Sequence, residues 1–159
     1  MVTLASLRAA FAAIVGRNNQ GVSFSSEWTT VLDTNLHARQ YPVCLWGPPD
    51  SLFVTPSTGR LTEVFMVDCL FLQETLPERT SAQRDTVVSD MHVIARDCFL
   101  LFWEENVKES TTMDLRLIEG ARFTAVYDRA GDACSGVRLE FRVASNEQPV
   151  CVGGNFSVS

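Results

Sequence analysis

Residues 80–107 read TSAQRDTVVSDMHVIARDCFLLFWEENV and carry the longest helical pattern in the chain. Apolar residues recur there at steps of three and four, which is the spacing of one face of an α-helix. This apolar stripe consists of Val87, Met91, Ile94, Cys98, Leu101 and Phe102, with Val88, Ala95 and Phe99 beside them. Thr80 or Ser81 can supply the capping oxygen for the first turn. The stripe predicts a long helix that packs across a sheet.

Strand patterns precede this helix. The most apolar run is residues 61–72 (LTEVFMVDCLFL), and both of its alternating faces are apolar, which is typical of a central strand. Asp68 interrupts one face, and we interpret it as a satisfied or edge-facing acid instead of a functional carboxylate. Shorter strands are predicted at residues 22–28 and 41–46. Residues 47–59 hold three prolines and two glycines, so they are predicted to form a loop.

Alternating patterns also follow the long helix. Apolar and polar residues alternate at 113–117, 123–127 and 137–143. Glu119-Gly120 is predicted to be a tight reversal between the first two segments, and residues 129–134 a second turn. The three segments together predict an antiparallel meander with one apolar face for the helix and one polar face.

The remaining elements complete the predicted fold. Residues 4–15 form a shorter amphipathic helix that Thr3 can cap. We therefore predict the α+β class: a mainly antiparallel sheet of five to six strands, with the long helix on one face and the shorter N-terminal helix. Residues 1–145 are expected to be a single α+β domain. Residues 146–159 are expected to be a C-terminal tail or an ordered arm, and the sequence leaves both alternatives open.

Composition restricts the classes of function. The chain has 159 residues and a formal net charge of −6, which argues against a general nucleic-acid binder, because phosphate neutralisation requires a clustered basic surface. No stretch is apolar for long enough to span a membrane. The apolar residues 1–15 lack a basic start and a small-residue cleavage site, so we expect a helix of the mature protein and not a signal peptide.

The sequence offers no recognisable catalytic, cofactor or metal motif. The histidines His37 and His92 lie far apart in the chain, and His92 is predicted to be a half-buried structural residue at the edge of the stripe. Cys98 is expected to point into the core, where a thiol is inert. The odd number of cysteines, without a close pair, predicts buried free thiols and folding in a reducing cytoplasm, most clearly for Cys44, Cys69 and Cys98. We expect no enzyme activity, no cofactor and no metal.

The order of these elements resembles a known family. Four features carry the resemblance: Tyr41-Pro42-Val43 opening a strand after an N-terminal helix and first strand, the run 61–72, the helix after it, and the closing strand 135–141 (SGVRLEF). This arrangement resembles the tail-terminator and tail-completion proteins of tailed bacteriophages, which belong to the head-to-tail neck. The match covers residues 1–144 and is one of architecture, without a diagnostic motif.

The resemblance implies a structural role in the virion. Such proteins form a homo-oligomeric ring, commonly a hexamer, that caps the tail tube and joins it to the head-tail connector. The implied partners are other virion proteins of the tail tube and neck, with DNA only as passing cargo and no membrane. The implied localisation is the virion, after synthesis in the host cytoplasm. The candidate subunit contacts are apolar residues of the 47–59 loop and of the C-terminal arm: Leu52, Phe53, Val54, Val150, Val152 and Phe156.

Two alternatives remain open. A cytoplasmic protein-interaction (adaptor) domain is favoured if Leu52, Phe53 and Val54 form a groove for a short peptide. A small enzyme is the less favoured alternative, because it requires a deep pocket in which Asp68 or His92 meets a second titratable group with a perturbed pKa.

Overall fold

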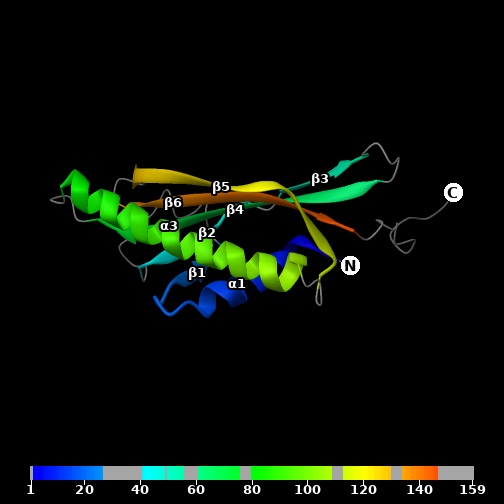
Figure 1. The fold of residues 1–159 in the computed structure, drawn as a ribbon, viewed down its shortest axis with the longest axis horizontal. Coiled ribbons are helices and arrows are strands. Elements are labelled where there is room, and N and C mark those ends of the chain that lie inside the picture. The colour runs from blue at the N-terminus through cyan, green and yellow to red at the C-terminus, as the bar shows by residue number, and fades with distance from the viewer. Residues whose placement is uncertain are drawn as a thin grey trace.

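The computed structural model of the protein describes residues 2–26, 41–48, 50–55, 61–75, 80–108, 113–129 and 134–146. These residues form a six-stranded, mostly antiparallel sheet with a long helix and a shorter N-terminal helix, which confirms the predicted α+β class (Figure 1). The elements are α1 (Leu4–Gly16), β1 (Ser23–Ser25), β2 (Val43–Trp46), β3 (Asp50–Val54), β4 (Thr62–Glu74), α3 (Ser81–Trp103), the π-helical turn η2 (Glu104–Lys108), β5 (Leu115–Arg129) and β6 (Cys134–Ser145).

The predicted central strand is the centre of the sheet. The strands lie in the order β1-β2-β4-β6-β5, and β3 pairs with β4 beside β2. β2 and β3 share one side of β4, with β2 opposite Cys69–Leu72 and β3 opposite Thr62–Met66, while β6 covers the other side. Only β1 and β2 are parallel among the described pairs. β4 is therefore hydrogen-bonded on both sides, as its continuous apolar sequence predicts.

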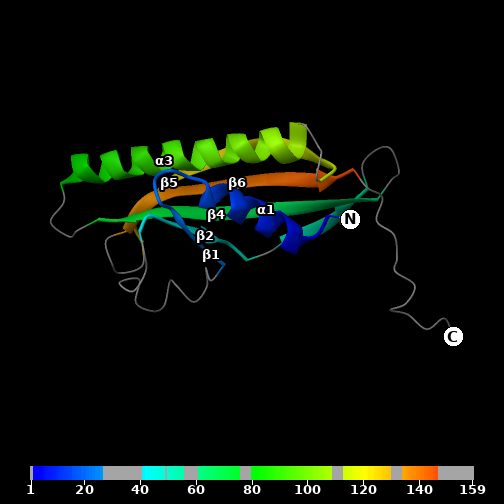
Figure 2. The same cartoon turned by 90° about the horizontal axis from the view of Figure 1, so that it is seen from below.

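Both helices begin where the sequence places their caps. Thr3 caps α1 and Thr80 caps α3, each in a capping box with the side chain three residues later. α3 runs along the sheet beside β5 and β6 (Figure 2), and every stripe residue except Leu101 is buried. Leu101 is 37% exposed, because it lies at the margin of this face, one heptad after the outermost buried residue, Ile94. Its assignment to the stripe was wrong.

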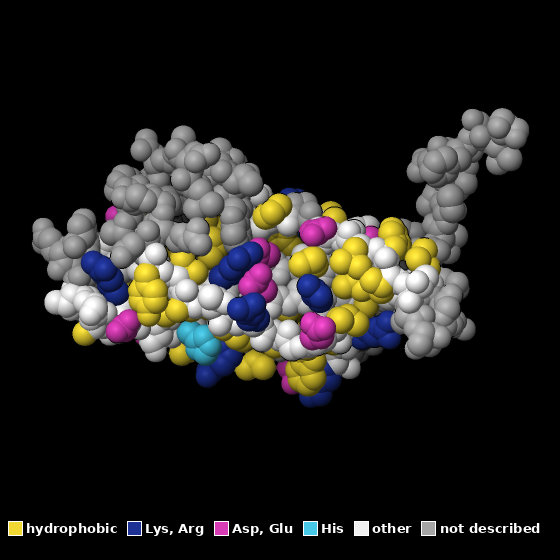
Figure 3. All heavy atoms as spheres, turned by 90° about the horizontal axis from the view of Figure 1, so that it is seen from above, with side chains coloured by type: hydrophobic (Ala, Val, Ile, Leu, Met, Phe, Trp, Pro, Cys, Tyr) yellow, Lys and Arg dark blue, Asp and Glu magenta, His cyan; other side chains and the backbone are white. Residues whose placement is uncertain are grey.

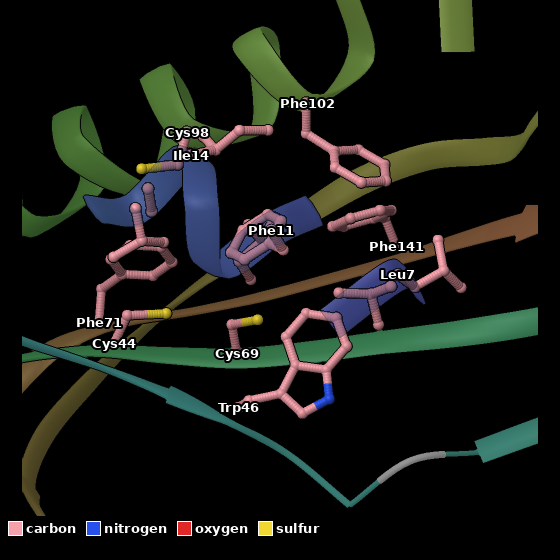
Figure 4. Packing of buried hydrophobic residues seen from close by; sticks show 14 of the residues in the cluster. Leu7, Phe11, Ile14, Cys44, Trp46, Cys69, Phe71, Cys98, Phe102 and Phe141 are labelled. Carbon is pink, nitrogen blue, oxygen red and sulfur yellow. The ribbon is translucent and has the colours of Figure 1, made fainter. Parts of the chain in front are cut away.

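The core lies between these helices and one face of the sheet. Phe11 of α1 is at its centre, with ring centroids 5.6 Å from Trp46, 5.8 Å from Phe102, 6.2 Å from Phe141 and 6.5 Å from Phe71 (Figure 4). These tilted and edge-on arrangements are the ones that aromatic quadrupoles favour. One α1 side chain thus joins β2, β4, β6 and α3.

The predicted reversal at Glu119-Gly120 is wrong. β5 is one continuous strand of 15 residues along β6. Glu119 has a φ of 61°, and the pairing partner changes from Arg142 at Ile118 to Glu140 at Arg122. The left-handed residue therefore produces a bulge with extra residues on β5, after which the strand resumes on the same partner. The meander has two strands where three were predicted.

The prediction of a loop at residues 47–59 is also wrong for its central residues. Residues 50–54 form β3, which pairs antiparallel with β4. The prolines that suggested a loop are at positions 48, 49 and 56, outside the paired residues, so none of them has to donate to the ladder. The first predicted strand is shorter than expected among the described residues, and Trp28 and His37 lie outside them.

Candidate functional site

Three strands lie at edges of the described sheet: β1 with three residues, β3 with five and β5 with fifteen. β5 pairs only with β6, and β3 pairs only with β4, among the described strands. The outer side of such a strand presents backbone N–H and C=O groups with which another chain can pair. These edges differ in how well they are protected.

The β5 edge carries features that discourage pairing. Its bulge interrupts the regular ladder, and Arg116, Glu119 and Arg122 are exposed along it. Bulges and charged side chains are two of the devices by which proteins protect sheet edges. The surface that includes this edge shows basic and acidic side chains interleaved with hydrophobic ones (Figure 3). β5 is therefore a poor template for a further strand.

The β3 edge is apolar and less protected. We use the name β3 edge for Leu52, Phe53 and Val54. Leu52 is 40% exposed, Phe53 is 56% exposed and Val54 is half-buried. In the ladder Leu52 lies opposite Val64 and Phe53 opposite Glu63, so their side chains point to opposite faces. An added strand could bury both.

The predicted contact residues are brought together only in part. Leu52, Phe53 and Val54 are consecutive on the β3 edge. Because their side chains alternate between two faces, they do not form one groove, which was the condition that favoured an adaptor domain. Val150, Val152 and Phe156 lie outside the described residues.

The sheet face opposite the helices carries a charged cluster. Arg138 Nε donates to Asp68 Oδ1 at 2.9 Å, and Nη2 donates to Oδ2 at 2.6 Å. Nη2 also lies 3.3 Å from Glu140 Oε1. The hydrogen bonds that Arg138 donates to Asp68 raise the pKa of Arg138. Asp68 is therefore a satisfied acid, as predicted. Arg138 was missed as its partner, because the two residues lie diagonally across β4 and β6 and the register is not visible in the sequence.

The condition set by the enzyme alternative is met only in part. Asp68 lines a hollow of about 280 Å³ on the sheet face opposite the helices, together with Glu119, Arg138 and Glu140. Its carboxylate is held there by the hydrogen bonds from Arg138.

His92 is exposed, not half-buried as predicted, and its ring lies edge-on to Phe123 at 5.1 Å. A hollow of about 540 Å³ between α3 and the end of β4 includes Gln73, Met91 and Asp90, and neither Asp68 nor His92 is among its described lining residues. In the described ranges, no group of three or more His, Cys, Asp or Glu is placed to hold a metal ion. No described helix combines the length and hydrophobicity that a membrane crossing requires.

Cys44, Cys69 and Cys98 are buried free thiols, as predicted. Cys134 is also buried, and its Sγ lies 3.1 Å from the Tyr41 hydroxyl. Burial raises the pKa of the Cys98 thiol to about 12 and that of Cys69 well above its ordinary value. A thiol that stays protonated is a poor nucleophile. The role of the Cys98 side chain is therefore to pack in the hydrophobic core.

This burial predicts that the protein loses stability in alkali. Above about pH 9 the thiols ionise in the unfolded chain, whereas Cys98 of the folded protein keeps its proton up to about pH 12. The unfolded state then binds fewer protons, so each such thiol lowers the free energy of unfolding by at most about 1.4 kcal/mol per pH unit. Denaturant unfolding of the wild type and Cys98→Ala between about pH 8 and 11 measures this effect. The variant should show the shallower decline, and equal slopes would contradict the assignment.

Comparison with models of known protein families gives no match to this chain, and comparison with curated proteins gives none.

Proposed function

We propose that the protein is a structural subunit of a phage virion, a tail terminator or neck protein that assembles with its own copies into a ring between the tail tube and the head-tail connector. Two observations support this proposal. The α+β architecture is the one that the resemblance implies. The β3 edge, which carries the proposal, is an apolar strand edge that lies exposed on the isolated subunit.

The β3 edge has the properties of a subunit contact. Pairing at its outer side would form backbone hydrogen bonds and would cover Leu52 and Phe53, which are 40% and 56% exposed. Burying the exposed part of each side chain contributes roughly 1 kcal/mol. A single contact of this kind is weak. A closed ring repeats it at every interface, which favours assembly over the free subunit.

The expected partners follow from this role. Copies of the chain form the ring, and other virion proteins of the tail tube and neck contact its two ends. DNA is passing cargo, because a net charge of −6 disfavours retention of a polyanion. The virion is the corresponding location, and no cofactor is required.

Assembly is the property to test. Light scattering and negative-stain electron microscopy of the purified protein, alone and with tail tubes, should show closed rings. The test variant is Leu52→Asp on the β3 edge, and its matched control is Leu100→Asp on the outer face of α3, where the leucine is 47% exposed. Leu52→Asp should weaken assembly at least about tenfold, because it places a charge in an apolar contact. Leu100→Asp should assemble normally.

Either of two results would overturn the proposal. A protein that stays monomeric at high concentration and forms no ring with tail tubes has no such function. Equal loss of assembly in Leu52→Asp and Leu100→Asp would show that the β3 edge is not part of the interface.

An adaptor domain is the second candidate function. The observation that favours it is again the β3 edge, with which no described strand other than β4 pairs, because an extended peptide of another protein can add to such an edge. Such a protein would stay monomeric with tail tubes, and Leu52→Asp would abolish binding of its peptide. Ring formation decides between the two candidates.

A further inference from the structure

We propose that residues 150–152 (VCV) of one copy pair as an added strand with the β3 edge of a neighbouring copy. The inference rests on the proposed function, and it names the contact that joins adjacent subunits of the ring. The occupant of the β3 edge is thus a segment of this same chain, supplied by a second copy.

The β3 edge fits this segment on both faces. Leu52 continues a row of apolar side chains across the sheet, opposite Val64 and then Ala144, which are 5% and 0% exposed. Val150 and Val152 alternate with Cys151, so as a strand they share one face. Placed beside Leu52 they extend the apolar row, while Cys151 lies on the other face with Ser51 and Phe53.

The β5 edge is a poorer acceptor for the same segment. Arg116 and Arg122 are exposed along it, and the bulge at Glu119 breaks the regular spacing of its backbone groups. Valines added there would lie against charged side chains. The strand β3 has no charged residue after Asp50, which is its first residue.

The length of the connection between β6 and residues 150–152 decides whether this segment can pair within its own copy or only with a neighbour. In the ladder Ala144 lies opposite Val64, so Asn146 is level with Thr62 and hence with Val54. A strand added outside β3 lies three strand spacings from β6, or about 14 Å. The four residues from Asn146 to Val150 reach about 14 Å only when fully extended along a straight path.

The segment of the same copy has no length to spare for this path, because even a straight connection requires full extension. Asn146 is also held on the β5 side of the sheet, where its backbone N–H donates to the Asp114 carbonyl at 2.9 Å and its Nδ2 to Asp114 Oδ1 at 2.7 Å. Figure 1 shows that β3 and the C-terminal end of β6 lie at the same end of the sheet. β4 is paired between them. The proposed pairing is therefore with the β3 edge of a neighbour, not with that of the same copy.

Cys151 makes the contact directly testable, because the four cysteines of the described residues are buried. Two full-length proteins are mixed before assembly. One is the wild type, and the other carries Ser51→Cys together with Cys151→Ser, which leaves Leu52 and Phe53 intact. Directly opposed residues of paired strands have Cβ atoms close enough for a disulfide. Mild oxidation of the assembled mixture should give a disulfide-linked pair of one copy of each protein, confirmed by peptide mass mapping.

Matched variants control for position and register. Phe53→Cys, also combined with Cys151→Ser, tests the register in which Cys151 of the wild type lies opposite Phe53. Arg116→Cys in the same background places the thiol on the β5 edge instead. We expect cross-linking with Ser51→Cys or Phe53→Cys and none with Arg116→Cys. Val150→Asp with Val152→Asp in the otherwise unchanged chain should weaken assembly at least about tenfold, as Leu52→Asp does.

The outcomes separate this inference from the proposed function. Rings without a disulfide at Ser51→Cys or Phe53→Cys, or with one at Arg116→Cys, would overturn the inference and leave the ring function standing. A disulfide within one chain, found when Ser51→Cys is introduced without Cys151→Ser, would place the segment on its own copy and would also overturn it. Absence of rings under every condition would overturn both the inference and the proposed function.

Discussion

Gly136→Ala should lower the free energy of unfolding by more than about 3 kcal/mol, because it forces backbone atoms of two central strands apart. Gly136 of β6 lies opposite Leu72 of β4. A Cβ atom at this position would overlap the Phe71 carbonyl oxygen and would lie 2.9 Å from the Phe71 carbonyl carbon and 3.0 Å from Leu72 Cα. All three are backbone atoms, so no side chain can rotate away to make room.

Gly120→Ala is the matched control. A Cβ atom at Gly120, in the β5 bulge, has no neighbour within 4 Å. The same chemical change there should alter the free energy of unfolding by less than about 0.5 kcal/mol. Denaturant unfolding followed by circular dichroism compares the two variants. If Gly136→Ala were as stable as Gly120→Ala, the close approach of β4 and β6 at this point would be wrong.

Phe11→Ala should lower the free energy of unfolding by about 3–5 kcal/mol, because it leaves a cavity at the centre of the core. Phe11 is fully buried, and its ring lies within 6.5 Å, centroid to centroid, of the rings of Trp46, Phe71, Phe102 and Phe141. These four residues belong to β2, β4, α3 and β6. The cavity therefore removes contacts that hold α1 to each of those elements, and neighbouring backbone has little freedom to fill it.

Phe53→Ala provides the contrast, since the Phe53 side chain is 56% exposed on the β3 edge. Measured on the monomer, this change should affect the free energy of unfolding by less than about 1 kcal/mol. The same change should weaken ring assembly, which separates the residues that stabilise the subunit from those that join subunits. A Phe11→Ala protein as stable as Phe53→Ala would contradict the packing of α1.

The elements that sequence predicts correctly are the ones that local chemistry determines. α3 has an apolar period, a capping box at Thr80 and few competing turn residues, so its start and its buried face follow from the sequence. β4 is apolar on both faces, which only a central strand in this sheet can satisfy. In these cases the local preference and the tertiary environment agree.

The elements predicted wrongly depend on partners far away in the chain. Glu119-Gly120 has the composition of a turn, but β6 offers a continuous partner for both halves of β5, so a bulge replaces the reversal. Residues 50–54 are surrounded by prolines, but β4 extends past β2 and leaves ladder positions that β3 fills. Neither outcome can be predicted without the lengths and registers of the neighbouring strands.

The candidate site shows the same division. Apolar residues within a proline-rich stretch were sufficient to identify Leu52, Phe53 and Val54 as candidate contacts. Their arrangement as a strand edge, and hence the kind of partner that they accept, required the pairing with β4. The Asp68–Arg138 ion pair likewise joins residues 70 positions apart in the chain.

The β5 bulge has a consequence for the parity of side-chain directions. Between Ile118 and Arg122 the strand advances four positions while β6 advances two, from Arg142 to Glu140. The surplus is even, and side chains of a strand alternate with a period of two, so the phase is unchanged across the interruption. Leu117 and Phe123, on either side of it, consequently both pack against the core. An odd surplus would have rotated one half of β5 by half a period and turned its hydrophobic side chains toward solvent.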